Sequence, residues 1–168
     1  MIVFHLEERL QIYKVGQVCV NGHAITGNVE AAASSKFCPR CGEETIVTCP
    51  SCRASIRGNR IIRSDFGNIS SGMHIPAFCH ACGKPFPWTE RAVAAAKELV
   101  DEVEGIETDE REKAKSSFIA LASDTAQTTV AATRVNKLIA KAGPILGKGI
   151  RDIVVSIATD AAKKAMGL

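Results

Sequence analysis

The stretch CPRCGEETIVTCPSC, residues 38–52, contains two Cys-x-x-Cys pairs separated by seven residues. A third pair lies in FCHACGKPFPWTE, residues 78–90, and the one remaining cysteine, Cys19, precedes His23 by four positions. Thiolates and imidazole nitrogens are the usual ligands of structural zinc, which takes four of them in a tetrahedron. Seven cysteines and one histidine therefore supply the eight ligands of two zinc ions.

A Cys-x-x-Cys pair forms a knuckle because its tight turn points both sulfurs at one metal ion, about 2.3 Å from each. A glycine after the second cysteine allows the left-handed backbone that completes the turn. Gly42 and Gly83 are such glycines, whereas no glycine follows Cys52. The order of the pairs favours sequential ligand sets, although the short interval between Cys41 and Cys49 also permits a crossed arrangement. The sequential prediction assigns Cys19, His23, Cys38 and Cys41 to site one, and Cys49, Cys52, Cys79 and Cys82 to site two.

His23 is the predicted eighth ligand because it and Cys19 flank the turn Asn21-Gly22, which resembles a knuckle. The chain has three other histidines, of which His80 lies inside the third Cys-x-x-Cys turn and would point outward.

Other uses of these cysteines fit less well. An odd number of thiols argues against a disulfide framework, and a thioredoxin-type pair would need a βαβ pattern that is missing. A rubredoxin-like iron centre competes only at site two. Glu7, Glu8 and Arg9 interrupt the apolar start of the chain, so this stretch is predicted to be neither a signal peptide nor a membrane-spanning helix. A cytoplasmic protein is therefore expected.

The texture of the sequence changes near residue 88. Residues 37–88 are turn-rich, with short β-branched pieces, and the prediction for residues 1–88 is a double zinc ribbon with an N-terminal lead-in strand. Residues 89–168 have helical periodicity and predict a tail of three or four helices. The predicted fold class is thus a small metal-stapled β domain followed by an all-α region. The helices are expected over 89 to about 104, 108–123, 125–142 and 144–166, the first two capped by Thr89 and Thr108.

The motifs around the cysteines resemble those of a bacterial family of zinc-ribbon proteins of unknown function. They are Cys19-x-Asn21-Gly22-His23, the three Cys-x-x-Cys pairs, and Lys84-Pro85-x-Pro87-Trp88-Thr89-Glu90. The resemblance covers residues 19–91 closely and the helical tail more loosely. It implies bound zinc and a bacterial cytosolic setting, and it implies no activity.

Net charge is +3, and the basic excess belongs to the cysteine-rich segment: residues 36–91 hold eight Lys/Arg against four Asp/Glu. Four arginines lie between the halves of site two, with Phe66 close by. On a hairpin they could form one basic face for a phosphate backbone or an acidic partner, or simply a solvated surface. These residues are Arg53, Arg57, Arg60 and Arg63.

The second candidate surface is an apolar stripe in the last predicted helix. The tail has Phe118 as its only aromatic residue, so its helices would gain from burial against a second copy or another protein. The alternative is that the stripe is the internal core of the tail. It consists of Ile150, Ile153, Val154 and Ile157.

No catalytic constellation is recognisable, and sites with four protein ligands leave no position for a substrate water. The predicted function is therefore a non-enzymatic adaptor or scaffold that holds two structural zinc ions and binds a macromolecular partner. A nucleic-acid-binding regulator that uses the arginines is the alternative, and a rubredoxin-like electron carrier is a further one.

Overall fold

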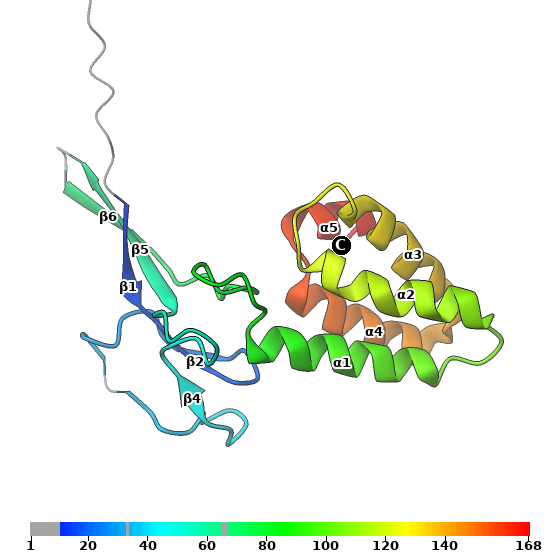
Figure 1. Cartoon of the computed structure of the whole chain (residues 1–168), viewed down its shortest axis with the longest axis horizontal. Helices are drawn as coiled ribbons and strands as arrows, with labels where there is room; N and C mark the ends of the chain where they lie inside the picture. Colours follow the sequence, from blue (N-terminus) through cyan, green and yellow to red (C-terminus); the bar gives the residue numbers. More distant parts are fainter. Residues whose placement is uncertain (1–10, 33, 65–66) are drawn as a thin grey trace, which may run out of the picture. The chain divides into compact units, whose positions relative to one another are not determined.

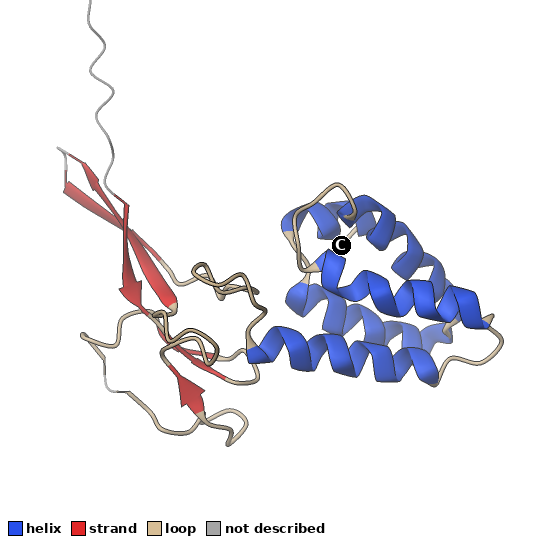
Figure 2. Ribbon diagram, in the orientation of Figure 1, coloured by secondary structure: helices blue, strands red, loops and turns tan. Residues whose placement is uncertain are grey.

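The chain divides into two compact units, Met1–Phe86 and Pro87–Leu168. The computed structural model describes residues 11–32, 34–64 and 67–168 (Figure 1). The first unit contains short strands and long loops, and the second contains only helices (Figure 2). The predicted class, a small β domain with cysteine clusters followed by an all-α region, is confirmed.

The described residues of the first unit form two antiparallel sheets of three strands. One sheet has the order β1-β5-β6, with β1 at Gln11–Val15, β5 at Arg57–Ser64 and β6 at Gly67–Ser71. The other has the order β3-β2-β4, with β2 at Gln17–Cys19, β3 at Ala24–Thr26 and β4 at Thr45–Ile46. Few large side chains are buried in this unit: Val18, Ile56 and Phe86 are almost inaccessible, together with the first cysteine of each knuckle.

The pairing of β1 with β5 contains a bulge. Tyr13 lies opposite Arg60, but Val15 lies opposite Arg57, so β5 has one residue more than β1 over this interval. The bulge occurs at Gly58, where a Cβ would lie 2.1 Å from the carbonyl oxygen of Gly27 and 2.8 Å from the nitrogen of Gly16. Only glycine fits between these backbones, so the crowding at Gly58 explains where the register shifts.

Residues 87–168, all of which the structure describes, form five helices rather than the predicted three or four. They are α1 at Pro87–Asp101, α2 at Thr108–Leu121, α3 at Thr128–Lys141, α4 at Gly143–Ile157 and α5 at Asp160–Met166. The extra helix arises because the predicted helix over 144–166 breaks at Ala158, whose backbone is extended. Thr159 then caps α5 by accepting a hydrogen bond from Ala162 N, and its own N–H donates to Leu121 O at 3.0 Å.

The predicted caps are also displaced. Helix α1 begins at Pro87, where the missing N–H costs nothing, and Thr89 lies buried within its first turn. Helix α2 has Glu107 rather than Thr108 at its N-cap position. Helix α3 begins at Thr128, because the hydroxyl of this residue donates to Ser123 O and holds the preceding turn out of the helix.

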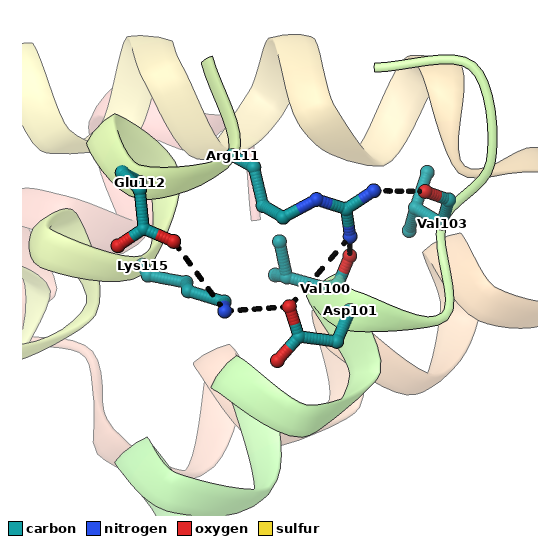
Figure 3. A network of polar contacts seen from close by, with 6 residues as sticks. All are labelled: Val100, Asp101, Val103, Arg111, Glu112 and Lys115. Carbon is teal, nitrogen blue, oxygen red and sulfur yellow. Dashed lines mark hydrogen bonds and ion pairs between the residues drawn. The ribbon is translucent and has the colours of Figure 1, made fainter. Parts of the chain in front are cut away.

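Arg111 of α2 closes the C-terminal end of α1, as Figure 3 shows. Its guanidinium donates to the carbonyl oxygens of Val100 and Val103, and it lies 3.8 Å from the carboxylate of Asp101. Val100 O is one of the last carbonyls of α1, which lack partners within the helix, and Val103 O belongs to the turn that follows, so one planar guanidinium joins the helix end to this turn. Lys115 pairs with the same carboxylate at 2.5 Å, and this hydrogen bond raises its pKa.

The apolar stripe of α4 belongs to the core of the helical unit. Ile150 and Val154 are fully buried, and Ile153 and Ile157 pack partly buried against the same core. The structure thus places this stripe in the internal core, which is the alternative stated above, and association through the helices stays a prediction. The α4 helix can approach its neighbours closely because Gly147 faces the backbone of Ile139, 2.8 Å from where a Cβ would lie. Within the described residues, no helix is both long enough and apolar enough to cross a lipid bilayer.

Candidate metal centres

Three knuckles share one backbone pattern. In each, the residue after the second cysteine donates its N–H to the carbonyl of the first cysteine, at 2.8–2.9 Å. The N–H of the first cysteine in turn donates to the carbonyl two residues after the second cysteine, at 2.7–2.8 Å. Each knuckle is thus complete within a few residues of chain, which is why the Cys-x-x-Cys spacing alone can specify it. The knuckles are Cys38–Cys41, Cys49–Cys52 and Cys79–Cys82.

The residue that closes each of these turns has left-handed backbone. Gly42 has a φ of 76° and Gly83 a φ of 72°, and Arg53 takes the same conformation, with a φ of 63°, where no glycine is present. Arg53 is the single residue other than glycine with positive φ in the described chain. The three knuckles therefore have the same turn geometry, and the knuckle that ends in Arg53, which lacks glycine, is strained.

The turn from Cys19 to His23 forms the fourth knuckle. Gly22 N donates to Cys19 O at 2.8 Å, and Cys19 N donates to His23 O at 2.9 Å. Asn21 N donates to the sulfur of Cys19 at 3.1 Å. Strand β2 ends at Cys19 and β3 begins at Ala24, so this knuckle is the hairpin turn between the two strands.

Site one combines the Cys19–His23 knuckle with the Cys38–Cys41 knuckle. The Nδ1 atom of His23 lies 3.7 Å from Cys19 Sγ and 3.5 Å from Cys38 Sγ, and Cys19 Sγ lies 3.5 Å from Cys41 Sγ. All four ligand atoms lie within 4.8 Å of one another. The imidazole therefore presents Nδ1, not Nε2, to the three sulfurs.

Site two combines the second and third Cys-x-x-Cys turns, Cys49–Cys52 and Cys79–Cys82. Cys49 Sγ lies 3.9 Å from Cys82 Sγ, and Cys52 Sγ lies 3.6 Å from Cys79 Sγ. All seven cysteines are in the described residues and each is a free thiol. Sulfurs at these separations are far outside the bond length of about 2.05 Å of a disulfide. The structure thus brings the eight residues together in the sequential sets and not in the crossed ones.

Backbone donors favour the thiolate form in both clusters. The N–H of Glu43 lowers the pKa of Cys41 to about 6, and the N–H of Ala81 lowers the pKa of Cys79 to about 6. At Cys52 the N–H of Ala54 acts in the same direction, but burial and the neighbouring thiols outweigh it and raise the pKa to about 12. Sulfurs this close cannot all be thiolates unless a cation neutralises them, so both clusters have the chemistry of cation sites.

The four arginines that the sequence suggested as one basic face do not lie on one face. Arg53 closes a knuckle, and the other three lie in β5. The bulge places Arg57 and Arg60 on the same side of the sheet, since they lie opposite Val15 and Tyr13, whereas Arg63 points to the other side. The sequence could not reveal this arrangement, because a spacing of three places residues on opposite faces of a regular strand. Phe66, the aromatic expected nearby, lies outside the described residues.

Tyr13 is the residue of this region that the sequence did not single out. The guanidinium carbon of Arg57 lies 4.6 Å from the centroid of the Tyr13 ring, a cation–π contact between β5 and β1. The two residues are far apart in the sequence, so no local pattern signals their contact.

Four knuckles paired into two clusters of four ligands define a double zinc-ribbon-like protein, which in this chain is followed by a helical unit. The chain belongs to the family described as an uncharacterized protein conserved in bacteria (DUF2321), whose model matches residues 12–166. No curated protein and no solved structure matches the chain.

Proposed function

We propose that each cluster binds one zinc ion and that the two ions hold the fold of the first unit. The observation that carries this proposal is the spacing of the ligand atoms. Zinc lies about 2.3 Å from sulfur and about 2.0 Å from nitrogen, so a tetrahedral ion separates two sulfurs by about 3.8 Å and a sulfur and a nitrogen by about 3.5 Å. The five separations given above run from 3.5 to 3.9 Å.

A structural role is supported by the ligand count and by the small core. Both clusters supply four protein ligands, which leaves no open position for a substrate water. The first unit buries few large side chains, whereas structural zinc contributes roughly 10–16 kcal/mol of apparent binding free energy in small domains. The protein is accordingly non-enzymatic in this proposal, and it works as an adaptor or scaffold that binds a macromolecular partner.

The proposed location is the cytoplasm of a bacterium. Its reducing conditions keep thiols such as these available for metal, and the family is conserved in bacteria.

Metal analysis of protein purified without added metal tests the proposal. Two zinc ions per chain are expected, and the variant His23→Ala is expected to retain one. Iron at site two, with a reversible one-electron colour change, would instead identify a rubredoxin-like electron carrier, since four thiolates suit iron equally well.

Chelation tests the structural role. Removal of both ions is expected to abolish the dispersed NMR signals of the first unit, while the helical circular dichroism of residues 87–168 persists. Retained dispersion after complete metal removal would exclude a structural role for the ions. The helical unit serves as the internal control, because its core contains no metal ligand.

A further inference from the structure

One side of the β1-β5-β6 sheet combines basic, aromatic and apolar side chains. We call it the Tyr13 face. Its members follow from the register, because residues directly opposite each other in antiparallel strands point to the same side. Tyr13 pairs with Arg60, Val15 with Arg57, and Ile62, two positions beyond Arg60, with Ile69 of β6. The three strands lie side by side in the first unit (Figure 1).

This face is open to solvent at several of these residues. The exposed fractions are 39% for Tyr13 and 64% for Ile69, and Arg57 is also exposed. Arg60 is half-buried, and its Nε atom is buried with no acceptor among the described residues. No described carboxylate therefore neutralises Arg60 at this atom, and the charge of its half-buried guanidinium can attract an anionic group.

The charge of the face is uniform. The three strands contain no Asp or Glu, and the segment from 45 to 64 contains four arginines and no acidic residue. Lys14, which points to the opposite side, is already paired with Glu30 at 2.8 Å. Among the described residues of the Tyr13 face, the charges without an ion-pair partner are therefore Arg57 and Arg60, which the Gly58 bulge places on one side.

We propose that the Tyr13 face binds single-stranded nucleic acid. The two guanidiniums would contact backbone phosphates, and the Tyr13 ring with its stacked Arg57 would support a base. An acidic peptide matches the charge alone, whereas a nucleic acid matches both the charge and the stacked planar groups. A single strand is favoured over a duplex because its unpaired bases can lie flat on an open sheet. This inference names the partner of the proposed adaptor and rests on that function.

The test measures fluorescence anisotropy of labelled oligothymidylate and oligouridylate of about twelve nucleotides, enough for one small domain. The full chain as purified should bind both probes. Binding of only one probe would also support the inference, and it would show that the protein distinguishes RNA from DNA through the 2′-hydroxyl. Arg57→Ala, Arg60→Ala and Tyr13→Ala should each weaken binding by about fivefold or more, in line with the loss of one charge or one stacked base. The double variant of the arginines should also lower the salt slope by about 1.4.

Arg63→Ala is the matched control, since it removes the same charge from the same strand on the other side. It should leave binding within about twofold, the range of a distant surface charge. Equal weakening by Arg63→Ala and Arg57→Ala would overturn the inference, because it would show attraction to net charge and not to one face. No binding of either oligonucleotide at low salt, tighter binding of a duplex, or preference for a labelled polyglutamate peptide would overturn it as well.

Metal content and circular dichroism of every variant separate the two proposals. A protein with two zinc ions that does not bind the probes contradicts only this inference. A protein with another metal that does bind them contradicts only the zinc assignment.

Discussion

Arg53 and Gly83 occupy equivalent positions in the two knuckles of site two, and both have left-handed backbone, with φ of 63° and 72°. A residue with a Cβ is less stable in this conformation than glycine by about 1–2 kcal/mol. The knuckle that ends in Arg53 is therefore strained, and its partner knuckle is not.

Arg53→Gly is expected to stabilise the first unit. The relieved strain exceeds the added chain entropy of glycine, so the net gain should be about 0.5–1 kcal/mol. Gly83→Ala introduces the strain into the other knuckle and should destabilise the unit by about 1–2 kcal/mol. Denaturant unfolding followed at the first unit, at one fixed free zinc concentration, measures both. If Arg53→Gly destabilised the unit as much as Gly83→Ala does, the contacts of the Arg53 side chain would contribute more stability than its left-handed backbone costs.

Gly58→Ala is expected to disrupt the β1–β5 pairing. The added Cβ would meet the carbonyl oxygen of Gly27, and because backbone cannot move aside as a flexible side chain does, the cost should reach about 3 kcal/mol. NMR chemical shifts of β1 and β5 and the unfolding midpoint report the change. Gly72→Ala is the control, since a Cβ there meets nothing within 4 Å. A tolerated Gly58→Ala with unchanged strand shifts would contradict the close approach of these backbones.

Ile150→Asp is expected to unfold the helical unit. Ile150 is fully buried, so the change places an unpaired carboxylate in the core and should cost more than about 4 kcal/mol. Ile145→Asp, the same substitution in the same helix at a residue that is 84% exposed, should leave the helical circular dichroism and solubility unchanged. If Ile150→Asp remains folded while losing an association, the assignment of this stripe to the core is wrong.

Arg111→Lys is expected to lower the stability of the helical unit. Lysine keeps the charge but lacks the planar fork that serves Val100 and Val103 together, so about 1–2 kcal/mol should be lost. Thermal unfolding of the metal-free protein isolates this unit and gives the difference. Lys113→Gln, which removes an exposed ion pair with Asp109 from the same helix, is the control and should leave the melting temperature unchanged. A melting temperature of Arg111→Lys equal to that of the unaltered chain would rule out a stabilising role for the two carbonyl contacts.

The metal-ligating residues could be predicted from the sequence because each knuckle is a local structure. Its hydrogen bonds join residues no more than five positions apart, so the spacing of Cys79 and Cys82 already implies the turn that the structure contains. The existence of helices over most of residues 87–168 was predictable for a similar reason, since the apolar period of a helix repeats every few residues. Their ends were less predictable: a single hydrogen bond from Thr159 to the distant Leu121 accompanies the break of the last helix into two.

The residue pattern was enough to show that eight ligands occur in four short turns, that the first part contains short strands and that the second is helical. The folded structure was needed to show which turns combine, which nitrogen of His23 faces the sulfurs, and that Ile150 and Val154 are core residues. It also decided that Arg57 and Arg60 share a face that Arg63 does not. The physical reason is the range of the interactions. Turns and helical periods depend on neighbours along the chain, whereas strand register and burial depend on residues that only the folded chain brings together.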